Sequence, residues 1–405
     1  MNNWQTVPLK DIGTFERGKG LQKSDFTDCG TPCVHYGQIF TYYGGFTNST
    51  ISFVSPETAK ECSIVHHGDT ILAITSENVQ DLCKSTVWLG DGDIVTGGHS
   101  GIFRHNQNPK FLGYYFQSEY FNHQKAKYAK GTKVIEINPE DILNRIKIKL
   151  PDLETQQKIV QILDTWNTSI NKLKELSEKE KSYFGSQCKL LLSQNNNQTI
   201  NYKLSDICSY KKGSGLSKEM LTNKGLPCIL YGELYTHYDY LIDKVYSKIP
   251  ITTIGVKSTM DDILIPASTT TNGKDLAIAS VIKQPDVLLG GDINIFRIKD
   301  TNTVDGTFLA LYLRYIKWRK MASRAQGITI VHLYGKDLLD LKIELPPLGI
   351  QKKIVSVIKC QREKINIIND YIIKLEQQYK YLLNHLISGD FDLTNIKLEK
   401  GKEQQ

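Results

Sequence analysis

Two long stretches of the chain place apolar residues three and four positions apart, with Lys, Glu and Gln crowding the positions between them. This spacing gathers the apolar side chains on one face of an α-helix. The first stretch runs from Leu150 to Leu192, and at 1.5 Å per residue a helix there reaches about 55–60 Å. The second runs from Leu345 to Ile387. We expect two helices that bury these faces against each other as a coiled coil.

The apolar positions define the two faces. They are Ile159, Ile162, Leu163, Trp166, Ile170, Leu173, Leu176, Phe184 and Leu191 in the first stretch, and Ile354, Ile358, Ile365, Ile368, Ile372, Leu375, Leu382 and Leu386 in the second.

The chain repeats itself at an offset of 195 residues, because Lys158–Val160 (KIV) recurs at Lys353–Val355. The same offset aligns LKDI with LSDI, Gly18, Gly20 and Leu21 with Gly213, Gly215 and Leu216, Pro32-Cys33 with Pro227-Cys228, and Tyr36-Gly37 with Tyr231-Gly232. Shifts of two or three residues align GDTIL at Gly68 with MDDIL at Met260, and Ile102–Arg104 with Ile295–Arg297. A period this long is not that of a solenoid. Each half is therefore a globular module followed by one long helix.

The modules alternate short β-branched and aromatic runs with Gly, Asn, Asp and Pro. After a short strand or turn at Trp4–Ile12, we expect strands at VHYGQIFTYYGG, STISFV, DTILAIT, STVWL and Ile102–Arg104, in a mixed or mainly antiparallel sheet. Helical spacing predicts helices over Lys110–Ala129 and Phe308–Ala325, ending at Gly131 and Gly327. An extended segment is expected over Val134–Leu150. The fold class is α+β.

These patterns divide the chain into six segments. We place a first module at 1–150, a helix at 151–192, a polar linker at 193–201, a second module at 202–345, a helix at 346–388 and a charged tail at 389–405.

The chain of 405 residues has a formal charge of +7 and a pI near 8.7. This mild excess of positive charge permits an acidic partner but does not demonstrate one, since a nucleic-acid-binding domain is typically more basic. We expect a cytoplasmic protein without a membrane contact, because no apolar run is long enough for a span and no signal-peptide pattern opens the chain. The eight cysteines form no CxxC pair. We expect Cys33 and Cys228, which are repeat-equivalent, to be buried free thiols.

The search for catalytic chemistry is mostly negative. Gly13–Gly20 nearly matches a phosphate-binding loop, but Gly20 stands where the metal-binding Ser or Thr would be, so we reject a nucleotide site. We interpret the run Gly18–Lys23 (GKGLQK) as an exposed basic turn. The chain has no Asn/Asp-Pro-Pro-Tyr/Phe segment for a flipped base and no Gly-rich loop for a methyl donor. The segment nearest to a nuclease pattern is Lys342-Ile-Glu344, and its counterpart in the first copy, Lys147-Ile-Lys149, lacks the acidic residue. The doublet His66-His67 has no counterpart in the second copy. We therefore expect a binding protein with no catalytic, metal-binding or cofactor-binding residues of its own.

Two kinds of segment are candidates for contact with DNA. The helix and turn before Gly131, and those before Gly327, mix Lys and Arg with aromatic residues, which suits phosphate contacts. A solvated helix face explains the same pattern equally well. Polar loops that differ between the copies are candidates for base contacts, namely Tyr36–Tyr43 against Tyr231–Tyr238 and Thr75–Lys84 against Ser268–Lys274.

The candidate DNA contacts come from these segments and from the basic turn of each module. They are Lys19, Gln22, Lys23, Tyr36, Gln38, Tyr42, Ser76, Asn78, Lys84, Lys127, Lys130 and Lys133 in the first copy, and Lys212, Ser214, Lys218, Tyr231, Glu233, His237, Thr269, Thr270, Asn272, Lys274, Arg319, Lys320 and Arg324 in the second.

The order of these motifs resembles the DNA-specificity subunits of Type I restriction–modification systems. The resemblance spans the chain and depends on the opening WQTVPLKDIGTFERGKG, the GDTIL and MDDIL turns, the helix starts LP…QQKIVQIL and LPP…QKKIVSVI, and the duplication. It implies two target-recognition domains that each read one half of a bipartite double-stranded DNA target, with the helices as the spacer. The chain itself would not be an enzyme.

The resemblance also implies partner subunits. These are two adenine-N6 methyltransferase subunits, which carry S-adenosylmethionine, and two restriction subunits that translocate DNA and use ATP and magnesium. On the helices we place candidate partner contacts at Gln157, Trp166, Lys352 and Gln361.

Physical reasoning agrees with the resemblance, since antiparallel helices would relate the modules by a pseudo-twofold axis that matches duplex DNA. Two alternatives remain open. A coiled-coil adaptor that binds proteins predicts no salt-sensitive affinity for DNA. A stand-alone nuclease or methyltransferase predicts modification of DNA without partners.

Overall fold

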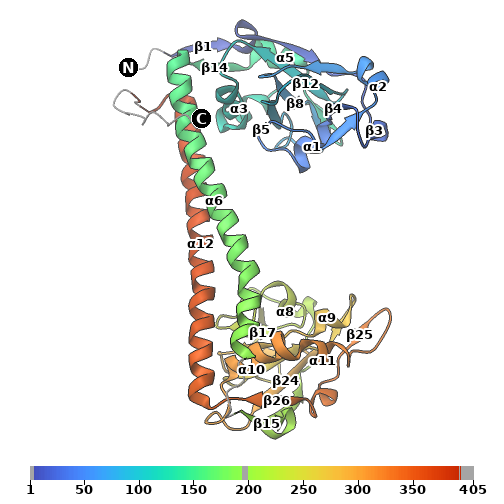
Figure 1. Cartoon of the computed structure of the whole chain (residues 1–405), viewed down its shortest axis with the longest axis vertical. Helices are drawn as coiled ribbons and strands as arrows, with labels where there is room; N and C mark the ends of the chain where they lie inside the picture. The colour runs from blue at the N-terminus through green and yellow to red at the C-terminus, as the bar shows by residue number, and fades with distance from the viewer. Residues whose placement is uncertain (1–3, 194–198, 392, 394–405) are drawn as a thin grey trace. The chain divides into compact units, whose positions relative to one another are not determined.

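The computed structural model describes residues 4–193, 199–391 and 393, and its chain forms two compact units (Figure 1). Unit 1 comprises Met1–Lys174 and Tyr371–Gln405, and unit 2 comprises Glu175–Asp370. The predicted linker at 193–201 and the predicted tail at 389–405 fall largely outside the described residues. Within the described part of the chain, none of the helices has a stretch apolar and long enough to cross a membrane.

Unit 1 contains two five-stranded sheets, ordered β2-β12-β8-β10-β5 and β3-β6-β4-β11-β7. Both are mixed, because β5 pairs in parallel with β10 and β4 pairs in parallel with β11, while the other pairs are antiparallel. The short pairs β1-β14 and β9-β13 complete the unit. The strands are β1 Gln5–Pro8, β2 Gly13–Arg17, β3 Phe26–Thr27, β4 Thr31–Val34, β5 Phe46–Thr47, β6 Ser52–Val54, β7 Ser63–Val65, β8 Thr70–Ala73, β9 Thr75–Ser76, β10 Ser85–Trp88, β11 Ile94–Thr96, β12 Ser100–His105, β13 Ile135–Glu136 and β14 Lys147–Leu150.

Unit 2 repeats this plan with sheets β16-β24-β20-β22-β18 and β19-β17-β23 and the pairs β15-β26 and β21-β25. Its strands are β15 Ile200–Lys203, β16 Cys208–Lys212, β17 Leu226–Ile229, β18 Leu241–Ile242, β19 Lys248–Ile249, β20 Asp262–Pro266, β21 Ser268–Thr269, β22 Ser280–Ile282, β23 Leu288–Leu289, β24 Ile293–Ile298, β25 Val331–His332 and β26 Lys342–Leu345. The expectation of a mixed sheet is confirmed in both units. Cys33 in β4 and Cys228 in β17 are buried free thiols, as predicted.

Short helices and helical turns connect the strands. In unit 1 they are η1 Leu9–Asp11, α1 Tyr36–Thr41, η2 Lys23–Asp25, α2 Pro56–Glu61, α3 Pro109–Gln117, α4 Glu119–Lys125 and α5 Pro139–Arg145; in unit 2 they are α7 Leu204–Ile207, η3 Lys218–Met220, α8 Glu233–Thr236, α9 Gly273–Leu276, α10 Gly306–Tyr312, η4 Leu313–Lys317, α11 Trp318–Ala322 and η5 Gly335–Leu338.

The strand predicted through VHYGQIFTYYGG is wrong beyond Val34, because α1 begins at Tyr36. The His35 ring accepts a hydrogen bond from the Gly37 amide at 3.1 Å. The Gln38 side chain accepts one from the His35 amide at 3.0 Å. These two reciprocal bonds form a capping box, and they start a helix where β-branched and aromatic residues favour a strand.

The predicted helix over Lys110–Ala129 is instead two helices, α3 and α4, separated at Ser118. The Ser118 hydroxyl caps the second helix by accepting from the Phe121 amide at 3.3 Å. The extended segment expected over Val134–Leu150 is wrong in its middle, where Pro139 at the first helical position and the Asn138 cap start α5. In unit 2 the corresponding helix continues through a π-helical turn, η4, between α10 and α11.

The motifs GDTIL and MDDIL lie at the start of β8 and of β20, where each supplies a carboxylate to an ion pair. Asp69 accepts from the His66 amide at 2.9 Å and forms an ion pair with Arg104 at 3.2 Å. Asp262 accepts from the Thr259 amide at 2.8 Å and bonds the Arg297 guanidinium at 2.9 and 2.8 Å. The aligned Asp and Arg therefore form the same internal bridge in both copies. This bridge explains why both motifs recur together.

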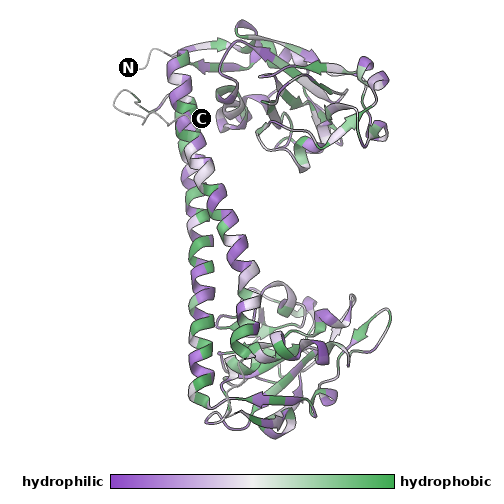
Figure 2. Cartoon of the chain, in the orientation of Figure 1, coloured by the Kyte–Doolittle hydropathy of each residue, from purple (hydrophilic) through white to green (hydrophobic). Residues whose placement is uncertain are grey.

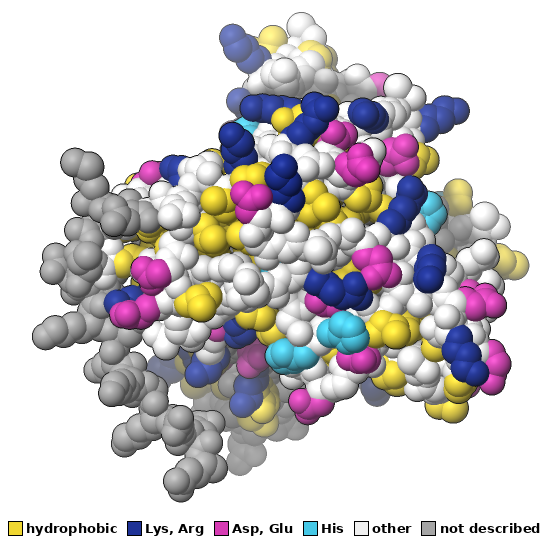
Figure 3. Space-filling view, turned by 90° about the horizontal axis from the view of Figure 1, so that it is seen from above, with side chains coloured by type: hydrophobic (Ala, Val, Ile, Leu, Met, Phe, Trp, Pro, Cys, Tyr) yellow, Lys and Arg dark blue, Asp and Glu magenta, His cyan; other side chains and the backbone are white. Residues whose placement is uncertain are grey.

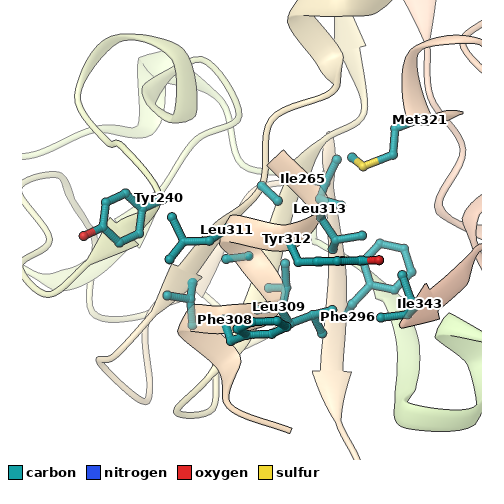
Figure 4. Close-up of a cluster of buried hydrophobic side chains, with 14 of the residues drawn as sticks. Tyr240, Ile265, Phe296, Phe308, Leu309, Leu311, Tyr312, Leu313, Met321 and Ile343 are labelled. Carbon is teal, nitrogen blue, oxygen red and sulfur yellow. The ribbon is translucent and has the colours of Figure 1, made fainter. Parts of the chain in front are cut away.

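A large aromatic and aliphatic core fills unit 2 around α10, β20 and β24. Figure 4 shows Phe308 and Tyr312 beside Leu309, with Phe296 and Ile343 close to them. The rings of Phe308 and Tyr312 lie 5.8 Å apart in a stacked arrangement. Unit 1 has an equivalent core in which Tyr114 and Tyr115 are completely buried. Each unit therefore has a core of its own.

The long helices are α6 Leu153–Leu192 and α12 Leu348–Ser388, and each contributes one part to each unit. Figure 2 shows hydrophobic and hydrophilic positions alternating along both helices. In unit 1, Lys174 forms an ion pair with Glu376 at 2.7 Å. In unit 2, Lys364 pairs with Glu180 at 2.7 Å. Within each unit the helices run antiparallel and pack together, as predicted.

One predicted seam position is wrong. Leu176 is 40% exposed, and the neighbouring Ser177 is buried instead. The Ser177 hydroxyl donates a hydrogen bond to the Asn369 side chain at 2.7 Å. A polar contact therefore interrupts the apolar seam at this turn.

Candidate nucleic-acid interface

In unit 1 the two predicted loops meet at a cleft of about 530 Å³. One wall comes from α1 and carries Tyr36 and Phe40, and the other comes from β9 and the following loop and carries Ser76 and Asn78. The chain places these two segments about forty residues apart in sequence. The two segments that the sequence suggested as base contacts therefore line one concave surface.

Two further residues of this cleft were not predicted from the sequence, His99 and Val134. The His99 ring lies 4.8 Å from the Tyr36 ring, and its Nδ1 is 3.0 Å from the Thr75 hydroxyl oxygen. His99 thus connects the α1 wall with the β9 wall. The only sequence signal was its place directly after the repeated Gly97-Gly98 pair.

Hydrogen bonds within the loop after β9 fix its shape. The Ser76 hydroxyl donates to the Asn78 carbonyl at 2.5 Å. The Asn78 side chain donates to the Asp81 carboxylate and accepts from the Asp81 amide, both at 2.8 Å. Asn78 is exposed, whereas Ser76 is 9% exposed. The loop is therefore preorganised, a property that lowers the entropy lost on binding.

In unit 2 the corresponding segments also contact each other. The Tyr235 hydroxyl of α8 donates to the Ser268 carbonyl of β21 at 3.0 Å. A separate hollow of about 410 Å³ brings Tyr231 together with Lys212 of the basic turn. In this second copy, the predicted residues Thr270 and His237 are exposed, and Thr269 is half-buried.

The residues after β21 form the start of α9. Asn272 is its N-cap, because its side chain accepts from the Lys274 amide at 3.0 Å. The Lys274 ammonium lies 5.8 Å from the centre of the Trp318 ring, and the Arg319 guanidinium lies 5.3 Å from the same ring. Trp318 therefore holds two cations beside the predicted loop.

Five predicted contacts lie on exposed turns of the surface. Lys19, Gln22, Lys23 and Lys218 are exposed, and Tyr42 is 63% exposed. The Gln22 amide donates to Asp25 at 2.6 Å and so shapes its turn. Leu21, which lies between Lys19 and Gln22 in the sequence, has a buried side chain. These turns are accessible to a polyanion.

Three predicted contacts have structural partners within the fold, which corrects the expectation that they face DNA. Gln38 donates to the Ser52 hydroxyl at 2.6 Å as well as capping α1. Its repeat-equivalent Glu233 is 8% exposed and accepts from the Leu230 amide at 2.6 Å and from the Ser247 hydroxyl. The Ser214 hydroxyl accepts from the Val256 amide at 2.9 Å and donates to the Leu289 carbonyl at 3.2 Å.

The basic helices are only partly available to a ligand. In unit 1, Lys127, Lys130 and Lys133 are exposed. By contrast, Lys125 is 3% exposed, burial lowers the pKa of its ammonium, and it donates to the Gln80 carbonyl at 3.0 Å and to that of Leu82. The first copy therefore presents a shorter basic face than its sequence indicates.

The second copy is similar. Arg319 and Lys320 are exposed, but Lys317 is 6% exposed and lies 3.2 Å from Glu344. The predicted contact Arg324 pairs with Asp340 and donates to the Asp337 carbonyl. Lys84 of the first copy likewise donates to the Phe40 carbonyl, at 3.1 Å. These two cations have partners inside their own units.

The predicted partner contacts lie on α6 and α12. Lys352 is exposed, Trp166 is half-buried, and the exposed Gln157 accepts from the Asn108 side chain at 2.7 Å. The side-chain oxygen of Gln361 is buried without a hydrogen-bond partner.

Acidic side chains accompany the basic ones over much of the surface. On the face seen in Figure 3, Lys and Arg lie among Asp, Glu and apolar side chains, with no continuous basic patch.

Among the described residues, no three His, Cys, Asp or Glu side chains form a group that could hold a metal ion. His66 contacts Asp93 at 2.7 Å, and His67 contacts the Gly90 carbonyl at 3.0 Å.

Comparison with known proteins identifies the family of this fold. The model of the Type I restriction modification DNA specificity domain matches residues 1–181 and again 196–377. The MjaVIII specificity subunit of Methanocaldococcus jannaschii, a type I restriction enzyme subunit, is 30% identical over 44% of this chain and 42% of the relative. The putative MjaX specificity subunit of the same organism is 27% identical over 96% of this chain and 93% of the relative.

Two solved structures have the same fold. A chain from a study of complex assembly and conformational transition of the type I R-M system matches with a TM-score of 0.67 and 18% identity, over 96% of this chain and 98% of that one. The HsdS subunit of Thermoanaerobacter tengcongensis matches with a TM-score of 0.55 and 18% identity, over 96% and 97% of the two chains.

Proposed function

Since the chain belongs to the Type I restriction–modification DNA specificity family, a non-catalytic family whose members carry no cofactor themselves, we propose that it selects the DNA sequence on which partner subunits act. Each unit reads one part of a bipartite, asymmetric double-stranded target. The observation that carries this proposal is the double match of the family model, once in each half of the chain.

The candidate interfaces of the two units support an asymmetric target. Unit 1 presents a cleft with Tyr36, His99 and Asn78, whereas unit 2 presents Tyr231 beside Lys212 and a loop rich in threonine. Hydroxyl, amide and ammonium groups are the side-chain groups that bond base edges in the major groove. Similar scaffolds with different side chains would therefore recognise different sequences.

The chemistry belongs to the partners in this proposal. The chain assembles with two adenine-N6 methyltransferase subunits that supply S-adenosylmethionine, and with two restriction subunits that use ATP and magnesium. The faces of α6 and α12 that carry Gln157, Trp166, Lys352 and Gln361 remain the proposed contacts for the methyltransferase subunits. Methylation and restriction then occur only where both units have bound their sequences.

The long helices, which connect the units covalently, set the number of base pairs between the two half-sites. Removing one matched turn from α6 and from α12 is expected to change this gap and leave both half-sites as they were. An unchanged gap would refute the spacer role.

Mapping of N6-methyladenine tests the proposed function. The chain is co-expressed with the methyltransferase subunit encoded beside it in a host that lacks other adenine methyltransferases, and the genome is sequenced for methylated adenine. We expect methylation at one asymmetric bipartite motif with a fixed gap. A stable complex that methylates no motif, or methylation without sequence preference, would contradict the proposal.

A further inference from the structure

Each unit contains a short hairpin with the same tight turn. In unit 1, the amides and carbonyls of Lys130 and Glu136 bond each other at 2.9 and 2.8 Å. In unit 2, Gln326 and His332 do the same at 2.8 and 2.7 Å. The turn depends on a glycine with positive φ, which is 111° at Gly131. A Cβ added there would lie 2.0 Å from the Val134 carbonyl oxygen.

The equivalent glycine of unit 2 has the same environment. Gly327 has a φ of 122°, and its Cβ would lie 2.1 Å from the Ile330 carbonyl oxygen. Only glycine fits both the conformation and the space. The two hairpins therefore share one backbone geometry, although their sequences differ.

The tips of both hairpins expose apolar side chains. Val134 is 62% exposed in unit 1, and Ile330 and Ile328 are 50% and 98% exposed in unit 2. Figure 1 shows the loop that leads into β25 projecting from the body of its unit, and Figure 2 shows hydrophobic positions at this tip. A single exposed apolar side chain is common on protein surfaces, but the recurrence of a β-branched one at the same turn of both copies marks this site.

The hairpins belong to the candidate DNA interface. The returning strand β13 pairs with β9, with Ile135 opposite Ser76. In unit 2, β25 pairs with β21 in the same way, with Val331 opposite Thr269. Val134 also lines the unit 1 cleft together with Tyr36 and His99. In both units the hairpin therefore forms a direct β-extension of the predicted base-reading loop.

Cations flank the apolar tips. In unit 1 they are the exposed Lys127, Lys133 and Lys130, the last of which also pairs with Asp141 at 3.7 Å. In unit 2, α9 contacts β25 and carries Lys274 beside Trp318. A duplex presents phosphates around a stack of apolar base faces, so an apolar tip between cations matches its chemistry. An acidic protein surface would also attract these cations, so the binding measurements must separate DNA from a protein partner.

We propose that these hairpin tips are wedges that enter the DNA at one base step in each half-site, with Val134 acting in unit 1 and Ile328 and Ile330 in unit 2. The proposal deepens the proposed function and depends on it. Inserted apolar side chains partially unstack a step and kink the duplex. A methyltransferase that modifies a base must extrude it from the stack, and a step that is already opened lowers this barrier.

The test uses the complex of the full chain with its methyltransferase subunit and duplexes that carry the mapped motif. 2-Aminopurine replaces one base at a time, because its fluorescence rises when it unstacks. The variants are Val134→Ser and the double variant Ile328→Ser with Ile330→Ser. The matched controls are Ile51→Ser in unit 1 and Ile254→Ser in unit 2, since these residues are 45% and 95% exposed outside the interface.

We expect wild-type complex to raise the fluorescence at one step in each half-site, and each variant to lose the signal in one half-site only. Binding to the paired duplex should weaken about tenfold, and a mismatch at the wedged step should restore it to within about twofold, because the mismatch removes the cost of unstacking. The controls should resemble wild type.

Three results would overturn the wedge: an unchanged fluorescence signal in the variants, an equal loss of affinity on mismatched duplex, or reduced binding of the methyltransferase subunit with unchanged binding of DNA. The last result would indicate protein docking instead. A wild-type complex that does not bind the mapped duplex would refute the proposed function itself, which distinguishes the two failures.

Discussion

Replacing Gln156 by alanine is expected to destabilise unit 1 strongly, whereas the same change at its neighbour Gln157 should leave the stability almost unchanged. Gln156 lies in the first turn of α6 and is completely buried. Its side-chain oxygen accepts from the Asn108 amide at 3.0 Å, and its nitrogen donates to the Gln107 side chain and the Pro151 carbonyl, both at 2.9 Å. These bonds join the start of the long helix to the loop before α3.

The magnitude follows from these contacts. A net contribution of about 1 kcal/mol for each of three hydrogen bonds, with buried donors and acceptors left unpaired, gives a loss of about 2–4 kcal/mol for Gln156→Ala. For a unit of this size, that loss lowers the melting temperature by about 5–12 °C. Gln351 makes the equivalent bonds to Asp305, Thr303 and Pro346 at 2.9, 3.0 and 2.8 Å, so Gln351→Ala should lower the transition of unit 2 by a similar amount.

Scanning calorimetry measures the change, and hydrogen exchange assigns each transition to a unit. Gln157→Ala is the matched control, since Gln157 is exposed and makes one bond, to the Asn108 side chain. We expect this control to stay within about 0.5 kcal/mol of wild type. Equal effects at the two positions, or a stable Gln156→Ala variant, would refute the assigned role.

Three further predictions test the ion pairs, the pH dependence and the basic face. Asp262 is completely buried against Arg297, so Asp262→Ala should lower the free energy of unfolding by about 3–5 kcal/mol in urea titration. Lys257→Ala, which breaks an exposed pair with Asp286, should change it by less than about 0.5 kcal/mol; similar losses would contradict this. Burial lowers the pKa of His105 to about 4, below its unfolded value of about 6.5, so its contribution is complete above pH 6.5 and is lost as the pH falls towards 4. His105→Phe should therefore remove about 3 kcal/mol of the acid destabilisation measured between pH 7 and 4, and an unchanged pH profile would exclude His105 as its source. Alanine at the exposed Lys127 or Lys130 should reduce the slope of log affinity for DNA against log salt concentration by about 0.9, without changing the methylated motif. The control is alanine at the exposed Lys60 of α2. A changed motif would mean that Lys127 or Lys130 reads bases.

Much of the fold could be predicted because its signals are local and repeated. The 3.6-residue period of α6 and α12 extends over forty residues, so occasional exceptions such as Leu176 do not obscure it. Strands such as β8 and β10 combine β-branched residues with flanking turns. The failure at α1 has a different cause, because one pair of capping bonds at His35 overrides the strand preference of its neighbours.

The candidate site was predictable only in part, because it depends on contacts between distant residues. Sequence reasoning found Tyr36 and Asn78, but nothing local placed His99 beside them. Gln38 seemed available because its partner Ser52 is fourteen residues away. In the first long helix, the sequence suggested Gln157 as a partner contact. Nothing local indicated that its neighbour Gln156 is the buried one.

If each unit reads its own part of the target, the repeat-equivalent tyrosines Tyr36 and Tyr231 should each affect a different half of it. The measurement is the N6-methyladenine motif of a host that expresses Tyr36→Ala or Tyr231→Ala with the methyltransferase subunit. We expect each variant to relax the sequence in one half of the motif, the two variants to affect opposite halves, and the gap to stay the same. Relaxation of the same half by both variants, or of neither half, would contradict it.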